Sequence, residues 1–212
     1  MVSTAQGDRE IYLRLPDDRV FEDRRPRLAD LDGDGRDEVI VVEAHADRGA
    51  ALVVFGVEGP ETSPRLVERA RSPHVGNMRW LNPIGAADFD GDGNLDLVSV
   101  TTPHIGGILT LYRYQPPKLV AFGETRDVSN HRMGAVEQRL GAIVALSGSA
   151  HMLIVPDQSR RSLRLLRWQK DGSWHSVAPN LPLAAAAERL VADPGGACLN
   201  LEDGSWLRLT LR

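Results

Sequence analysis

The stretch LADLDGDGRDEVIVV at residues 28–42 returns at residues 86–100 as AADFDGDGNLDLVSV. Each copy has the pattern Asp-x-Asp-Gly-Asp-Gly-x-x-Asp/Glu, followed by an apolar run. Because Asp88 follows Asp30 by 58 positions, the chain carries an internal repeat. This spacing is longer than that of helix-pair repeats. It fits a propeller blade, which has roughly 40–50 residues, with one long loop.

Each copy is followed by segments that alternate between apolar and polar residues. Residues 50–59 and 64–72 follow the first copy, and residues 106–124 follow the second. Frequent β-branched residues and the two-residue period predict strands in these segments. The run VIVV at 39–42 has no polar face, which indicates a strand buried on both faces. The inner strands of a propeller blade have this property because each blade lies between two others.

Weaker copies of the unit follow. Residues 130–148 are similar to residues 82–100 but carry Glu137, Gln138 and Arg139 in place of the alternating aspartates. We therefore predict an all-β fold, a single β-propeller domain over residues 1–212 with four blades. The predicted blades are residues 26–83, 84–133 and 134–185, and residues 186–212 completed by 1–25. Both chain ends would close the ring, which leaves no long open sheet edge. The alternative is a fragment of a larger propeller.

Strong helix formers at 134–140 and 183–193 also predict one or two short helices.

The acidic loops have the pattern of metal sites. Alternating aspartates place three carboxylates on one tight loop, and the glycine at the sixth position permits a sharp turn. Oxygen ligands suit Ca²⁺ better than zinc or copper. The predicted ligands of two Ca²⁺ ions are four side chains in each loop and one backbone carbonyl: Asp30, Asp32, Asp34, Glu38 and the carbonyl of Arg36, and Asp88, Asp90, Asp92, Asp96 and the carbonyl of Asn94.

The loops are not EF-hands, because the twelfth position holds Val41 or Ser99 and a strand follows instead of a helix. Mg²⁺ fits less well, since it keeps several waters and a strict octahedral geometry. Four carboxylates in one loop repel each other unless a cation lies among them. An acidic, solvated turn without metal is the alternative, and two copies with identical ligand spacing argue against it. Asp37 lies outside the ligand pattern.

The two acidic stretches resemble FG-GAP/VCBS repeats, the calcium-loop blades of integrin alpha-subunit propellers and of many exported bacterial proteins. The resemblance is strong over about residues 26–125. It implies a β-propeller, calcium held by the two ligand sets given above, and an extracytoplasmic (periplasmic or secreted) location. The chain departs from the family's Phe-Gly and Gly-Ala-Pro signatures, for which the second unit has only Pro83-Ile84-Gly85-Ala86.

Composition excludes several classes of protein. Lys+Arg 25 against Asp+Glu 29 gives a net charge of −4, which lacks the basic excess typical of nucleic-acid binding. The single cysteine, Cys198, rules out an intrachain disulfide and argues against a thiolate metal site. No run of 18 apolar residues predicts a membrane span, and no signal peptide is visible at the N-terminus.

No catalytic motif is evident. There is neither HExxH nor Gly-x-Ser-x-Gly, and residues 147–150 are predicted to form a turn. His104 and His131 lie in predicted loops, where a hydrogen-bonded surface role is commoner than catalysis. The sequence therefore predicts a non-catalytic calcium-binding scaffold for a protein partner. A carbohydrate-binding module is the first alternative and requires exposed aromatic rings, with four candidates: Trp80, Trp168, Trp174 and Trp206. A polysaccharide-active enzyme is the second.

Overall fold

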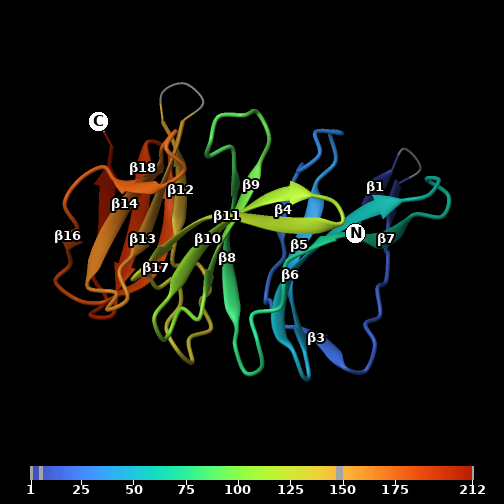
Figure 1. Cartoon of the computed structure of the whole chain (residues 1–212), viewed down its shortest axis with the longest axis horizontal. Coiled ribbons are helices and arrows are strands. Elements are labelled where there is room, and N and C mark those ends of the chain that lie inside the picture. The colour runs from blue at the N-terminus through green and yellow to red at the C-terminus, as the bar shows by residue number, and fades with distance from the viewer. Residues whose placement is uncertain (1, 5–6, 147–149, 212) are drawn as a thin grey trace.

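The computed structural model describes residues 2–4, 7–146 and 150–211, and every regular element in these ranges is a strand. The all-β class predicted from the sequence is confirmed. The predicted turn at 147–149 lies outside the described residues. The strands form successive curled sheets that follow one another from the N-terminal to the C-terminal side of the molecule (Figure 1). Such a series of sheets is consistent with a β-propeller.

The first sheet carries the first acidic loop. Its strands are antiparallel, and both β3 and β4 pair with β5. The bounds are β3 (Arg19–Phe21), β4 (Arg27–Ala29), β5 (Glu38–His45), β6 (Gly49–Glu58) and β7 (Arg65–Arg71). Ile40, Val41 and Val42 on β5 are buried, as expected for a strand covered on both faces.

The second sheet repeats this arrangement around the second acidic loop. Its four antiparallel strands are β8 (Leu81–Ala87), β9 (Asp96–Thr101), β10 (Ile108–Gln115) and β11 (Lys118–Arg126). A parallel contact between Lys118 on β11 and Arg71 on β7 joins the outer strands of the first two sheets. The two sheets are therefore continuous at one edge.

Two further sheets complete the series. The third sheet contains β12 (Ala142–Ala145), β13 (His151–Pro156), β14 (Ser162–Trp168) and β15 (Trp174–Ser176), with β16 (Leu181–Pro182) paired to β14. The fourth contains β17 (Ala187–Asp193), β18 (Gly196–Leu201) and β19 (Trp206–Thr210). Near the N-terminus, β1 (Val2–Thr4) and β2 (Gly7–Arg9) pair with each other.

A separate apolar cluster fills each space between neighbouring sheets. Ile40 and Leu52 of the first sheet belong to one cluster with Leu81 and Leu97 of the second. The next cluster joins the second and third sheets through residues such as Leu109 and Leu166. A third cluster joins the third and fourth sheets: its members include Ile154, Leu190 and Leu199. Each inner sheet is thus packed on both faces, as the blades of a propeller are.

The first strands of the second and third sheets lie close together. A Cβ atom added to Gly141, just before β12, would lie 2.9 Å from Ile84 Cδ1 on β8. A Cβ atom on Gly85 would lie 3.2 Å from Ile143 Cδ1 on β12. Absent side chains at these two positions let β8 and β12 converge. The second and third sheets therefore meet at their first strands.

The strand pairing does not support the predicted closure of the ring by both chain ends. β3 pairs with β5 in the first sheet, and among the described residues the fourth sheet consists of β17, β18 and β19 alone. The N- and C-termini also lie on opposite sides of the molecule (Figure 1). The four-bladed ring and the fragment of a larger propeller therefore both stay predictions.

The predicted short helices are wrong. Residues 187–193 form β17 and lie against β18, although alanine-rich segments favour helices. Burial explains the difference, because Ala187 and Leu190 are fully buried between the third and fourth sheets. Residues 134–140 contain no helix: they include a turn and a bend before β12, and Leu140 is bridged to Leu190. Tertiary packing decides the conformation of both segments.

Candidate metal centre

Both acidic loops are connections between the first and second strands of a sheet. β4 ends at Ala29 and β5 begins at Glu38, and these two residues are paired across the hairpin. In the second sheet, Ala87 at the end of β8 pairs with Asp96 at the start of β9. The last acidic position of each motif is therefore held at the base of a hairpin. The side chain at that position, Glu38 or Asp96, therefore lies near the first aspartate of its loop.

The same hydrogen bonds recur in both loops. The Leu31 N–H donates to Glu38 Oε2 at 2.9 Å, and the Phe89 N–H donates to Asp96 Oδ2 at 3.3 Å. The side chains of Leu31 and Phe89 are buried and anchor each loop to the core. The first aspartate of each loop accepts the N–H of the sixth-position glycine, which has a φ of 85° in Gly35. A positive φ is readily adopted by glycine, so the sequence pattern and the turn agree.

In the first loop, carboxylate oxygens of Asp30, Asp32 and Glu38 lie within 4.8 Å of one another. Asp30 Oδ1 is buried and has no hydrogen-bond partner among the described residues. The pKa of Glu38 is raised, first by burial and then by the nearby aspartates, against the lowering effect of the Leu31 N–H. The cluster is thus short of positive charge. A cation placed among these oxygens would remove the deficit.

The second loop has the same excess of negative charge, and its effect on a carboxyl pKa is larger. Oxygens of Asp88, Asp90 and Asp96 lie within 4.8 Å of one another. Burial, with a further contribution from Asp90, raises the pKa of Asp96 to about 7. Asp96 Oδ1 is buried without a hydrogen-bond partner among the described residues. Two loops 58 positions apart therefore converge on the same arrangement of oxygens.

Not every predicted ligand joins these clusters. Asp34 accepts hydrogen bonds from the Arg36 side chain and backbone N–H, which lower its pKa, and it lies outside the first group. Asp92 accepts from the Asn94 backbone N–H at 2.8 Å and lies outside the second. Both carboxylates stay predicted ligands. The carbonyl oxygens of Arg36 and Asn94 stay predictions.

The donor chemistry of the clusters fits Ca²⁺. All the gathered donors are carboxylate oxygens, and histidine and cysteine are absent from both groups. Hard oxygen ligands on a flexible loop are typical of calcium sites, whereas zinc sites favour nitrogen and sulfur. The unpartnered oxygens of Asp30 and Asp96 supply the buried acceptors that such an ion requires.

Arg113 contacts the second loop, and the sequence pattern of the loop does not predict this contact. It is paired with Asp96 across β9 and β10, and its guanidinium forms an ion pair with Asp90 and lies 3.9 Å from Asp92. Its carbon Cζ also lies 4.4 Å from the centre of the Phe122 ring. Arg113 partly neutralises the second cluster. Only the register of the β9–β10 hairpin could have indicated it.

The second loop is also attached to the third sheet. His151, at the start of β13, donates from Nδ1 to the carbonyl oxygen of Asp88 at 2.9 Å. The ring of Phe89 packs edge-on against Trp174, with centroids 5.3 Å apart. Trp174 in turn packs against Trp168. The conformation of this loop is therefore linked to the packing of two sheets.

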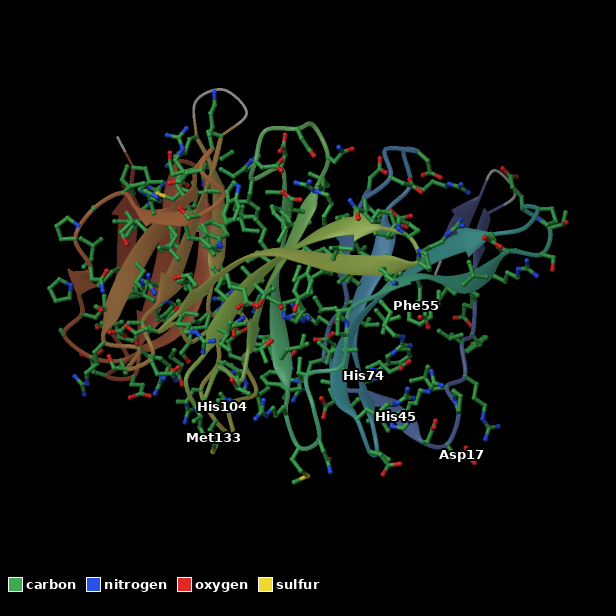
Figure 2. The ribbon with its side chains drawn as sticks, viewed as in Figure 1. Asp17, His45, Phe55, His74, His104 and Met133 are labelled. Carbon is green, nitrogen blue, oxygen red and sulfur yellow. The ribbon has the colours of Figure 1, made fainter. Side chains whose placement is uncertain are left out.

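The histidines form separate small groups. His104 Nε2 and His131 Nδ1 are 2.8 Å apart, and Trp80 packs against both rings. The side chains of His104 and Met133 lie near the lower edge of the molecule in Figure 2. His45 and His74 belong to another group below Phe55 in the same view, with ring centroids 5.9 Å apart. Burial lowers the pKa of His104 and of His131, which favours a neutral, hydrogen-bonded pair.

The tryptophans are mostly packed inside the protein. Trp168 is buried in the core between the second and third sheets, and Trp80 and Trp174 contact other rings. Trp206 on β19 is 67% exposed and is the one tryptophan found among the exposed large hydrophobic residues of the described chain. Sugar-binding faces built from several stacked rings need more than one exposed aromatic. The tryptophans therefore do not form such a face.

The comparisons with known proteins support the repeat. Residues 30–99 match the model of the FG-GAP-like repeat, and this segment begins at the first ligand of the first loop and includes both loops. The resemblance inferred from the sequence is thereby confirmed for this segment. No curated protein matches the chain. The described part of the chain contains no helix with the length and apolarity that a membrane crossing requires.

Proposed function

We propose that this protein is a calcium-binding β-propeller scaffold that presents a surface for a protein partner. The proposal depends on one observation above all. Two loops of matching sequence gather three carboxylates each, and one buried oxygen in each loop has no hydrogen-bond partner among the described residues. A calcium ion in each loop would balance this charge and fix the hairpin between the first two strands of its sheet.

The role of calcium would be structural. Each loop lies at a hairpin end whose residues Leu31 or Phe89 reach into the core between the sheets. An ion that binds the folded loop and not the unfolded chain stabilises the fold by mass action. Calcium concentrations high enough to fill such loops are typical of extracytoplasmic compartments. A periplasmic or secreted location is therefore part of the proposal.

A binding role for a protein partner is favoured over the two alternatives. The FG-GAP-like repeat matched by residues 30–99 is generally found in non-catalytic scaffolds. The packed positions of three tryptophans disfavour a carbohydrate-stacking face. An enzyme requires a cleft with a polar group poised for proton transfer, and the densest acidic clusters are accounted for by the proposed calcium sites.

Calorimetric titration of chelator-treated protein with Ca²⁺ tests the calcium assignment. The wild type should bind two ions, and Asp32→Asn and Asp90→Asn should each remove one. Asp37→Asn is the matched control, because Asp37 is exposed, lies in the first loop and falls outside the ligand pattern. Two ions bound with unchanged affinity by either ligand variant would refute the assignment. A parallel titration with Mg²⁺ should show weaker binding.

A further inference from the structure

Segments at or just before the first strands of the four sheets line a cleft of about 790 Å³. The segment before β4, the strand β8, residues 130–141 before β12 and Glu188 on β17 all contribute to it. The Arg24 N–H donates to Gln138 Oε1 across this cleft at 3.2 Å. The cleft therefore lies where the sheets converge. It is separate from the acidic loops, none of whose predicted ligands line it.

The lining of the cleft is rich in arginine. It contains two acids, Glu137 and Glu188, against five arginines: Arg24, Arg25, Arg27, Arg132 and Arg139. This excess of positive charge contrasts with the net charge of −4 for the whole chain. A cleft whose lining has a net positive charge attracts ligands of negative charge.

Three of the arginines already have acidic partners. Arg27 forms an ion pair with Asp23 and donates to Asn82 Oδ1 at 3.0 Å. Arg132 lies 3.3 Å from Glu188, and Arg139 lies 2.9 Å from Glu137. The side chains of Arg24 and Arg25 are exposed, and no acidic partner of either is found in the described part of the chain. These two guanidinium groups are available to an anionic ligand.

A buried amide supplies a second, independent feature of the cleft. Asn130 lines it and is only 1% exposed. Its Nδ2 donates to the carbonyl of Asn82, whereas its Oδ1 is buried without a hydrogen-bond partner among the described residues. The neighbouring Asn82 side chain is fully used: it donates to two carbonyls and accepts from Arg27. Asn130 Oδ1 is therefore a buried acceptor in the cleft wall that no described residue satisfies.

We propose that this cleft binds an acidic peptide segment, with Asp or Glu carboxylates held by Arg24 and Arg25. Arginine binds carboxylates through paired, charge-assisted hydrogen bonds. Apolar residues between the arginines, among them Ile84 and the 66% exposed Val136, suit the aliphatic side chains of a peptide. No aromatic ring lines the cleft, which disfavours an acidic sugar. The inference names the partner class of the proposed scaffold and rests on that proposal.

Fluorescence anisotropy with a labelled hexapeptide of alternating glutamate and leucine tests this inference in millimolar calcium. The peptide should bind, and replacing its glutamates by glutamine should weaken binding by about tenfold or more. The double variant Arg24→Gln, Arg25→Gln should show the same loss. The matched control is Arg126→Gln, Arg167→Gln, which removes two exposed arginines that do not line the cleft and should bind as the wild type does.

Adding calcium to chelator-treated protein while following thermal unfolding separates the two proposals. Stabilisation by calcium without peptide binding would overturn the acidic-peptide inference and leave the calcium scaffold intact. Peptide binding that depends on Arg24 and Arg25, without any calcium effect, would support the inference and refute the calcium sites. A labelled oligogalacturonate gives the remaining outcome: if it binds with the same arginine dependence and the peptide does not, the ligand is an acidic sugar and the peptide assignment is wrong.

Discussion

The imidazole of His151 donates from Nδ1 to the backbone carbonyl oxygen of Asp88 across 2.9 Å, and this bond joins the third sheet to the second acidic loop. Asp88 is the first residue of the loop, and its side chain belongs to the proposed calcium cluster. Any change in the third sheet that moves His151 therefore acts on the loop backbone. The second site is coupled to the packing between sheets.

Replacing His151 by alanine should weaken calcium binding at the second loop and leave the first loop unchanged. The lost hydrogen bond should also lower the free energy of unfolding by about 1 kcal/mol. Calorimetric calcium titration and urea unfolding measure the two effects. His175→Ala is the control, since His175 is exposed on β15 of the same sheet and its partner is Asp171. Equal calcium affinities at both loops of His151→Ala would contradict the coupling.

Arg113 should compete with calcium at the second loop. Its guanidinium contacts Asp90 and lies near Asp92 and Asp96, so Arg113→Gln removes positive charge from the site. We expect tighter calcium binding at this loop at low ionic strength, together with lower stability of the metal-free protein. The control Arg126→Gln, on the adjacent strand β11, should change neither. Weaker calcium binding by Arg113→Gln would show that the arginine assists the site.

Ionisation of Asp96 should lower the stability of metal-free protein as the pH rises between about 4 and 7, whereas the lowered pKa values of His104 and His131 act in the opposite direction. The pKa of Asp96 is raised to about 7 in the folded protein, above its ordinary value of 3.8, so the folded state holds more protons than the unfolded state in this interval. The contribution of Asp96 to the unfolding free energy then falls with increasing pH and levels off above its folded pKa. Glu38 acts in the same direction. Thermal unfolding in a chelator at a series of pH values measures the trend.

The variant Asp96→Asn provides the control for this pH dependence, because its side chain does not titrate. It should show a shallower decline than the wild type over the same interval. Saturating calcium should stabilise the wild type more at pH 7.5 than at pH 5, since the ion binds the ionised carboxylates. A calcium effect that is equal at both pH values would argue against carboxylate ligands.

Gly123 on β11 should tolerate no side chain. A Cβ atom there would lie 2.2 Å from Cη2 of Trp168, which fills the space between the second and third sheets. Gly123→Ala should therefore lower the free energy of unfolding by about 1–3 kcal/mol through overpacking. In a Trp168→Phe background the same substitution should cost less, because the smaller ring removes the clashing atoms. Equal costs in both backgrounds, measured by urea unfolding, would rule out this contact as the cause.

The parts of the fold and site that the sequence predicts are those encoded within a few residues. The acidic motif lies within nine positions, so its spacing indicates the convergence of Asp30, Asp32 and Glu38. The apolar run at 39–42 likewise indicates a buried strand. The sequence does not predict the strand at 187–193, because burial between two sheets overrides the helix preference of its alanines.

Long-range features left no local signal. His151 reaches Asp88 from 63 positions away, and the arginine-lined cleft is built from segments near residues 24–27, 83–84 and 130–141 and from Glu188. Each segment alone looks like an ordinary charged or apolar stretch. Only the order and packing of the sheets brings them together. The same holds for the N-terminal segment, whose pairing with β5 could not be distinguished from pairing with the last sheet.

The position of calcium in a crystal grown in millimolar calcium tests the central claim most directly. Anomalous diffraction recorded at a wavelength where calcium scatters strongly should show one peak in each acidic loop, about 2.3–2.6 Å from the ligand oxygens. Asp30, Asp32 and Glu38 should surround the first peak, and Asp88, Asp90 and Asp96 the second. Density at both loops that shows only water, with no anomalous signal, would contradict the account.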